Sequence, residues 1–159
     1  MKEFSIHEVI EQAIRTEQLG YEFYTQTAKK FEDDNSLNTL FLNLAEKERH
    51  HEEVFTRLKD KVDDQDFNEW EEVSNYFRAV VESEFFLGKN KSLPSLDHIT
   101  SVKEAVRFAI SFEKETLLYF VGIKSEVHES DSQIVEEIIE EEKSHIIWLT
   151  KFRDSLPVS

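Results

Sequence analysis

The sequence predicts an all-α protein, a bundle of four long helices with a long, partly helical crossover between helices 2 and 3. Three observations indicate this fold class. The 159 residues include only three Gly and two Pro, so few residues interrupt a helix. Apolar residues recur at spacings of three and four in four stretches, which is the period of one helix face. Clusters of Ser, Asp and Asn, which favour helix N-termini, precede these stretches. A chain of this length is typical of one domain, and we expect a single domain over residues 1–159.

The first two helices are predicted from their caps and apolar faces. Ser5 and Glu8 have the spacing of a capping box, so we expect the first helix to begin at Ser5. The cluster 33–36 ends that helix and can cap the next one. The expected buried face of the first helix is Val9, Ile10, Ala13, Ile14, Glu17, Tyr21, Tyr24, Ala28 and Phe31. The expected buried face of the second is Leu37, Phe41, Leu44, Glu48, His51, Phe55 and Leu58.

The segment from about residue 60 to 101 has a different character and is predicted to be the crossover connection. It opens with an acidic turn at 63–66. A helix is expected over 67–87, with Trp70, Val73, Phe77, Val80 and Val81 on its apolar side. A loop containing Pro94 is expected over 88–97. The segment is long enough to serve as the crossover connection that some four-helix bundles need.

The last two helices repeat the pattern of the first two. Ser101 and Glu104 have the spacing of a second capping box, and the cluster 130–132 is expected to precede the fourth helix. The expected buried residues are Val102, Val106, Ala109, Glu113, Thr116, Phe120, Ile123, Val135, Ile138, Glu142, His145, Leu149 and Phe152. Residues 13–24 align without gaps on 109–120, and 44–51 align on 138–145. The repeat predicts two helix pairs related by a pseudo-twofold axis.

Carboxylates and imidazoles interrupt these apolar faces at matching places. The pattern Glu-x-x-His occurs twice, as Glu48–His51 and Glu142–His145, and one further Glu precedes each pair by about thirty residues. Residues three apart on a helix share a face, so each pair can reach one point. We predict that six residues ligate two metal ions: Glu17, Glu48, His51, Glu113, Glu142 and His145. Carboxylate and imidazole ligands together suit iron, and manganese is possible with the same set.

A metal-free polar core is the alternative. Six His in an acidic chain are expected to give about one Glu-x-x-His by composition alone. The metal interpretation is favoured because buried carboxylates are costly unless paired, protonated or metal-bound, and these faces carry almost no Lys or Arg. The remaining His, namely His7, His50, His98 and His128, are interpreted as surface or capping residues. The other glutamates, including Glu46, Glu52, Glu53, Glu140 and Glu141, are interpreted as a solvated acidic face.

Tyr24 lies two turns after Glu17 on the same face, and it is the candidate catalytic residue. It would act as a redox-active or hydrogen-bonding tyrosine near the metals. The alternative is a tyrosine at the edge of the bundle core. Its equivalent in the repeat is Phe120, which cannot donate a hydrogen bond.

Composition excludes several classes of function. The net charge of -15 argues against binding to nucleic acid and to anionic membranes. The absence of Cys excludes disulfides, a thiol nucleophile and Cys-ligated metal centres. No stretch has the length of a membrane span, and the N-terminus has no apolar core of a signal peptide. We therefore expect a cytoplasmic protein.

The chain resembles the ferritin-like superfamily and, within it, the rubrerythrin-type di-iron proteins. The resemblance rests on Ala13-x-x-x-Glu17 followed by Tyr24, on Leu44-Ala45-x-x-Glu48-x-x-His51, on Ala109-x-x-x-Glu113 and on Glu142-x-x-His145. It implies a four-helix bundle with two Fe ions held by the six residues, and reduction of peroxide or oxidation of Fe(II). Rubrerythrins proper also carry a Cys-rich rubredoxin-like domain, which is absent here, so an external electron donor protein is implied.

A second departure concerns the ligand set. Rubrerythrins tend to carry an extra Glu one turn after the third-helix ligand, where this chain has Thr116, with Gly20 at the paired place. The resemblance therefore implies a site closer to the symmetric ferroxidase type. The rival interpretations are a non-enzymatic acidic helical module for iron binding or oligomerisation, and iron storage in a shell. A homodimer is expected, because the apolar side of the crossover helix needs a cover.

Overall fold

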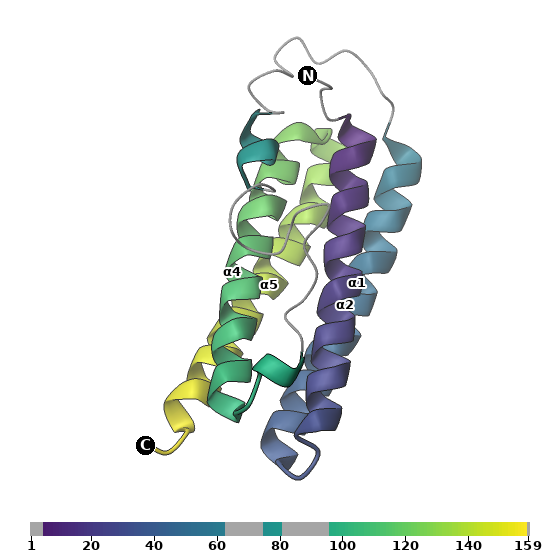
Figure 1. Ribbon diagram of the computed structural model, residues 1–159. Helices are drawn as coiled ribbons and strands as arrows, with labels where there is room; N and C mark the ends of the chain where they lie inside the picture. Colours follow the sequence, from purple (N-terminus) through teal and green to yellow (C-terminus); the bar gives the residue numbers. More distant parts are fainter. Residues whose placement is uncertain (1–4, 63–74, 81–95, 159) are drawn as a thin grey trace.

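A computed structural model describes residues 5–62, 75–80 and 96–158. Its architecture is a bundle of long helices lying side by side (Figure 1). The elements are, in chain order, α1 (Ile6–Lys30), α2 (Asn35–Lys61), η1 (Leu96–His98), α4 (Val102–Glu126) and α5 (Glu129–Ser155). Residues 75–80 are also helical. The predicted all-α fold class is confirmed.

The helices form two hairpins, α1 with α2 and α4 with α5. Helix α2 ends at one end of the bundle and α4 begins at the other, so these two helices run in the same direction (Figure 1). The intervening chain therefore has to travel the length of the bundle, as the predicted crossover requires. Its helical residues 75–80 pack on α4, where the Tyr76 hydroxyl donates to the Leu118 carbonyl at 2.8 Å and the Phe77 ring lies 5.1 Å from that of Tyr119.

The predicted crossover helix over 67–87 lies largely outside the described residues. Within the part described, Phe77 and Val80 are buried as expected. Trp70, Val73 and Val81 lie outside, as do the acidic turn 63–66 and most of the predicted loop 88–97. The end of that loop forms the short 3-10 helix η1.

The predicted helix starts are confirmed for α1, α2 and α4, and the start of α5 is corrected. Ser5 forms the full capping box with Glu8, and Asp34 caps α2 through the Leu37 N–H. Ser101 accepts from the Glu104 N–H, but the Glu104 carboxylate binds Thr100, so the reciprocal box is not formed.

Helix α5 begins at Glu129, earlier than predicted. The Ser and Asp residues of 130–132 therefore lie inside its first turn instead of before it. Glu129 and Asp131 place negative charge there, which the positive end of the helix dipole favours.

The core consists of two apolar clusters, one toward each end of the bundle. One includes Ile10, Ala13, Phe55 and Ile139, and the other includes Phe23, Ala45, Phe112 and Leu149. Along every helix the predicted ligands lie between members of the first cluster and members of the second. Apolar side chains therefore separate the polar residues from both ends of the bundle.

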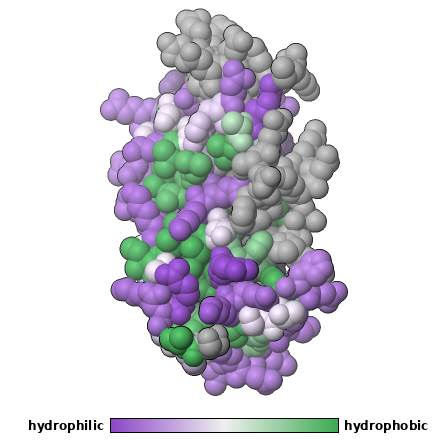
Figure 2. Space-filling view, turned by 60° about the vertical axis from the view of Figure 1, so that its left-hand side comes forward, coloured by the Kyte–Doolittle hydropathy of each residue, from purple (hydrophilic) through white to green (hydrophobic). Residues whose placement is uncertain are grey.

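Most predicted core residues are buried, four are only partly buried and one is exposed; the partly buried ones are Ile14, Phe31, Val102 and Phe152. Tyr21 was expected on the buried face of α1, but it is 39% exposed, and Gly20 is buried in its stead. Elsewhere, hydrophobic patches reach the surface between hydrophilic side chains, as the face in Figure 2 shows. Among the described residues no helix is both long enough and apolar enough to cross a membrane.

Candidate metal centre

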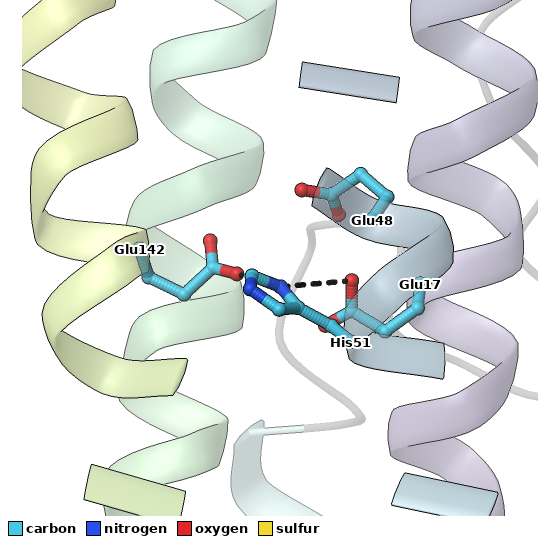
Figure 3. A group of neighbouring side chains, drawn as sticks. All are labelled: Glu17, Glu48, His51 and Glu142. Atoms are coloured by element: carbon cyan, nitrogen blue, oxygen red, sulfur yellow. Dashed lines mark ion pairs between the residues drawn. The ribbon is translucent and has the colours of Figure 1, made fainter. Parts of the chain in front are cut away.

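The six predicted ligands meet at the middle of the bundle. Glu17 comes from the centre of α1, Glu48 and His51 from α2, Glu113 from α4, and Glu142 and His145 from α5. The side chains of all six have no exposed surface. In Figure 3, Glu17 and His51 reach from their helices toward Glu142, which projects from the opposite hairpin. The apolar faces on which the residues were predicted are therefore the faces that point inward.

The six residues form two overlapping groups that could each hold one metal ion. The first, here called the His51 cluster, is Glu17, Glu48, His51 and Glu142. The second, the His145 cluster, is Glu48, Glu113, Glu142 and His145. In each cluster the ligand atoms lie within 4.8 Å of one another. Glu48 and Glu142 belong to both clusters, which is the arrangement that bridging carboxylates need.

The polar atoms of the centre fit metal ligation. Both oxygens of Glu17, Glu48 and Glu142 are buried without a hydrogen bond of normal geometry, as are Nδ1 of both His residues. A buried donor or acceptor without a partner costs about 1–3 kcal/mol. Several such atoms in one place are difficult to explain in a purely structural polar core. Two divalent ions would satisfy them together and balance the four carboxylates.

The imidazoles face the carboxylates directly. His51 Nδ1 lies 2.8 Å from Glu142 Oε1 and 3.6 Å from Glu17 Oε2. His145 Nδ1 lies 3.4 Å from Glu142 and 3.6 Å from both Glu48 and Glu113. Burial lowers the pKa of each imidazole, but the surrounding carboxylates outweigh it. They raise the pKa of His51 to about 12 and that of His145 to about 10. Without metal, both imidazoles are therefore protonated on both nitrogens and carry a positive charge at neutral pH.

The carboxylates differ from one another in the same environment. Burial, followed by repulsion from Glu17, Glu113 and Glu142, raises the pKa of Glu48 well above its ordinary value. Burial and repulsion from Glu142 raise the pKa of Glu113 to about 8. Burial also acts to raise the pKa of Glu142, but contacts with Glu113 and both imidazoles hold it well below the ordinary value. Glu142 therefore carries a negative charge in the metal-free centre, where it faces both imidazoles.

Tyr24 lies beside this centre and is fully buried. Its hydroxyl donates a hydrogen bond to Glu113 Oε1. Burial and the nearby carboxylates raise its pKa well above the ordinary value, so it remains a neutral donor. These contacts favour a hydrogen-bonding role near the centre, and they disfavour the alternative of a tyrosine at the edge of the core. The remaining histidines, His7, His50, His98 and His128, lie outside the centre, and none of them is buried.

Sequence reasoning missed Glu141. It was assigned to the solvated acidic face, but its carboxylate lies 3.2 Å from His51 Nε2 and its side chain is only 36% exposed. The hydrogen bond with His51 lowers the pKa of Glu141 to about 2. The repeat held a signal for this role: Glu141 directly precedes Glu142, and the equivalent residue before Glu48 is Lys47. The two half-sites therefore differ where their imidazoles need an outer partner.

Gly20 lets the backbone of α1 come close to a residue of the centre. A Cβ atom added there would lie 2.6 Å from Glu48 Oε2 and 2.9 Å from the Phe112 ring. Gly20→Ala is therefore expected to displace Glu48 and to lower metal content per chain, with a loss of about 1–3 kcal/mol in the free energy of unfolding. Metal analysis and urea unfolding measure both effects.

Gly122→Ala is the matched control, because its Cβ would crowd Tyr76 at 2.6 Å, away from the six ligands. It should cost stability but leave metal content unchanged. Equal metal content in both variants would show that Gly20 does not make room for a ligand.

Comparisons with known proteins agree with this geometry. A protein from Thermotoga maritima, described as a ferritin-like diiron-carboxylate protein, has a crystal structure that matches this chain with a TM-score of 0.71 and 25% identity, over 98% of each chain. The fold is thus ferritin-like. No curated protein matches the chain closely enough for comparison. The rubrerythrin family model matches residues 8–153. With that match over most of its length, the chain belongs to the rubrerythrin family.

Proposed function

We propose that this protein holds two iron ions at the centre and reacts with hydrogen peroxide or dioxygen, either reducing peroxide or oxidising Fe(II). The observation that carries the proposal is the set of buried, inward-facing carboxylate and imidazole atoms without hydrogen bonds. The diiron description of the Thermotoga maritima protein supports iron over manganese, since the ligand types alone suit both metals.

The proposed ligands have distinct tasks. Glu48 and Glu142 would be shared between the two ions, because each belongs to both clusters. Glu17 and Glu113 would each serve one ion, together with His51 and His145 respectively. Bound iron supplies the one-electron redox changes that peroxide or dioxygen chemistry needs. The apolar clusters on either side limit the entry of water, which strengthens every electrostatic interaction in the centre.

Thr116 bears on which reaction is favoured. It lies one turn after Glu113, is fully buried and offers a hydroxyl instead of a further carboxylate. The described ligands are thus six, with an equal number from each hairpin, and this symmetry supports Fe(II) oxidation. Reduction of peroxide is the reaction that rubrerythrin family membership supports. We retain peroxide or oxygen scavenging as the first candidate, with an external electron donor protein, because the chain has no Cys for an electron-transfer centre of its own.

An anaerobic Fe(II) titration of the purified full chain tests the proposal. We expect about two irons per chain, and a rapid rise in near-ultraviolet absorbance when peroxide or oxygen is added. The faster oxidant shows whether peroxide or dioxygen is the preferred electron acceptor of the Fe(II)-loaded centre. Absence of Fe(II) uptake would contradict the proposal and favour a non-enzymatic helical module.

A further inference from the structure

We propose that the two metal positions of this centre are unequal: the His51 cluster binds a divalent metal more tightly and fills before the His145 cluster. The inference rests on the proposed function, because it concerns the same two-metal centre. It comes from the residues that surround the ligands, which break the symmetry of the repeat in two independent places.

The first asymmetry is the support of His51. Nδ1 of this ring points into the centre and Nε2 points outward to Glu141, at 3.2 Å. Lys47 Nζ lies 3.4 Å from the same Glu141 carboxylate oxygen and holds it in place. A carboxylate on the outer nitrogen fixes the ring orientation, leaves the lone pair on the inner nitrogen and makes the imidazole a stronger ligand.

His145 has no equivalent support among the described residues. Its Nδ1 also faces the carboxylates, but its Nε2 is buried without a hydrogen-bond partner. The repeat places Lys47 where a counterpart of Glu141 would stand, and an ammonium group can only donate. The outer neighbour of the ring is instead Trp148, whose ring centroid lies 5.6 Å away. Nothing described there therefore fixes the tautomer of His145 or strengthens it as a ligand.

The second asymmetry lies at the unshared carboxylates. Tyr24 donates a hydrogen bond to Glu113, which draws electron density from a ligand of the His145 cluster. The equivalent residue for Glu17 is Phe120, and neither Glu17 oxygen accepts a hydrogen bond of normal geometry in the described part of the chain. Both asymmetries act in the same direction: the His51 cluster has the stronger imidazole and the stronger unshared carboxylate.

Stepwise anaerobic titration of the metal-free full chain with Co(II), followed by its visible absorption, tests the inference. The wild type should bind two equivalents, the first at least about tenfold more tightly than the second. His145→Ala should keep a tight single equivalent, whereas His51→Ala should keep only a weak one. Equal steps in the wild type, or a tight step that survives in His51→Ala, would overturn the order of filling.

Glu141→Ala tests the positioning residue itself. It should weaken the first step about 10–100-fold and leave the second step within about twofold. Glu140→Gln is the matched control, because Glu140 is the residue next to Glu141, and its exposed carboxylate pairs with Lys143. It should change neither step. Glu141→Gln keeps an oxygen acceptor and should restore part of the loss. An unchanged first step in Glu141→Ala, or an equal weakening in the control, would show that Glu141 does not position His51.

Tyr24→Phe removes the hydroxyl that donates to Glu113 and leaves Phe at this position, as at Phe120, its equivalent in the repeat. It should tighten the second binding step and bring the affinities of the two steps closer together. A weaker second step would contradict the carboxylate argument.

The same titrations distinguish failure of the proposed function from failure of this inference alone. A wild-type chain that takes up no Co(II) and no Fe(II) removes the proposed function and this inference with it. Two equivalents bound with equal affinity remove only the inference.

Discussion

Replacing Glu48 with glutamine is expected to abolish binding of both metals and to leave the metal-free chain as stable as the wild type, or more stable. Glu48 belongs to both clusters, so its loss removes a ligand from each. Its carboxyl is buried without a hydrogen bond, and repulsion from three other carboxylates adds to the effect of burial in raising its pKa. The substitution keeps the shape of the side chain and removes that repulsion.

Glu142→Gln is the matched variant, because Glu142 is also shared but has the opposite electrostatic role. It faces both imidazoles, at 2.8 Å and 3.4 Å, and its pKa is held well below the ordinary value. Its neutralisation should cost about 3 kcal/mol, since it removes the one negative charge that faces both buried imidazolium groups. Urea unfolding of both metal-free variants, with metal analysis, provides the comparison. A loss of stability in Glu48→Gln as large as that in Glu142→Gln would show that Glu48 is a structural partner instead of a ligand.

Metal uptake should release protons and become tighter as pH rises from 6 to 8. The pKa values of His51, His145 and Glu113 are raised to about 12, 10 and 8, so all three groups hold protons in the metal-free chain at pH 7. Ligation requires their deprotonated forms, so protons compete with metal. Each proton released makes the overall affinity rise about tenfold per pH unit. The dependence should be steepest below pH 8 and weaken above it, once Glu113 has lost its proton.

Calorimetric titration with Mn(II) in two buffers of different ionisation enthalpy measures the number of protons released. Glu140→Gln is again a suitable control, because it changes the net charge without touching the centre. A metal affinity that is independent of pH in this range would show that the imidazoles are already neutral.

The clustering of the six candidate ligands could be predicted because their spacing obeys helix geometry within single helices. Glu48 and His51 lie three apart, among apolar neighbours, and the same holds for Glu142 and His145. That all six residues would be buried together follows from the faces on which they lie. Periodicity could therefore identify the set of residues, and the structure adds which of their atoms contact one another and at what distances.

The errors at the buried faces and at the centre depend on relations between helices. Gly20 contributes nothing to a hydrophobic pattern, and its burial is understood only once Glu48 occupies the space beside it. Tyr21 has the right spacing for the core, but the rotation of α1 directs it outward. Glu141 was assigned to solvent because it is off the apolar face of α5, yet it reaches His51 on α2. Periodicity describes one helix at a time and does not contain the angle at which two helices meet.

The division of the ligands between the two hairpins has a kinetic consequence. Each cluster takes three ligands from one hairpin and a single carboxylate from the other, Glu142 for the His51 cluster and Glu48 for the His145 cluster. Contacts within a hairpin are local and form early, whereas docking of the hairpins closes the long loop between α2 and α4. Two bound ions would therefore cross-link the two hairpins, whose docking is expected to be the slow step of folding. The hairpins could then separate only after Glu48 and Glu142 had both dissociated from the metal ions.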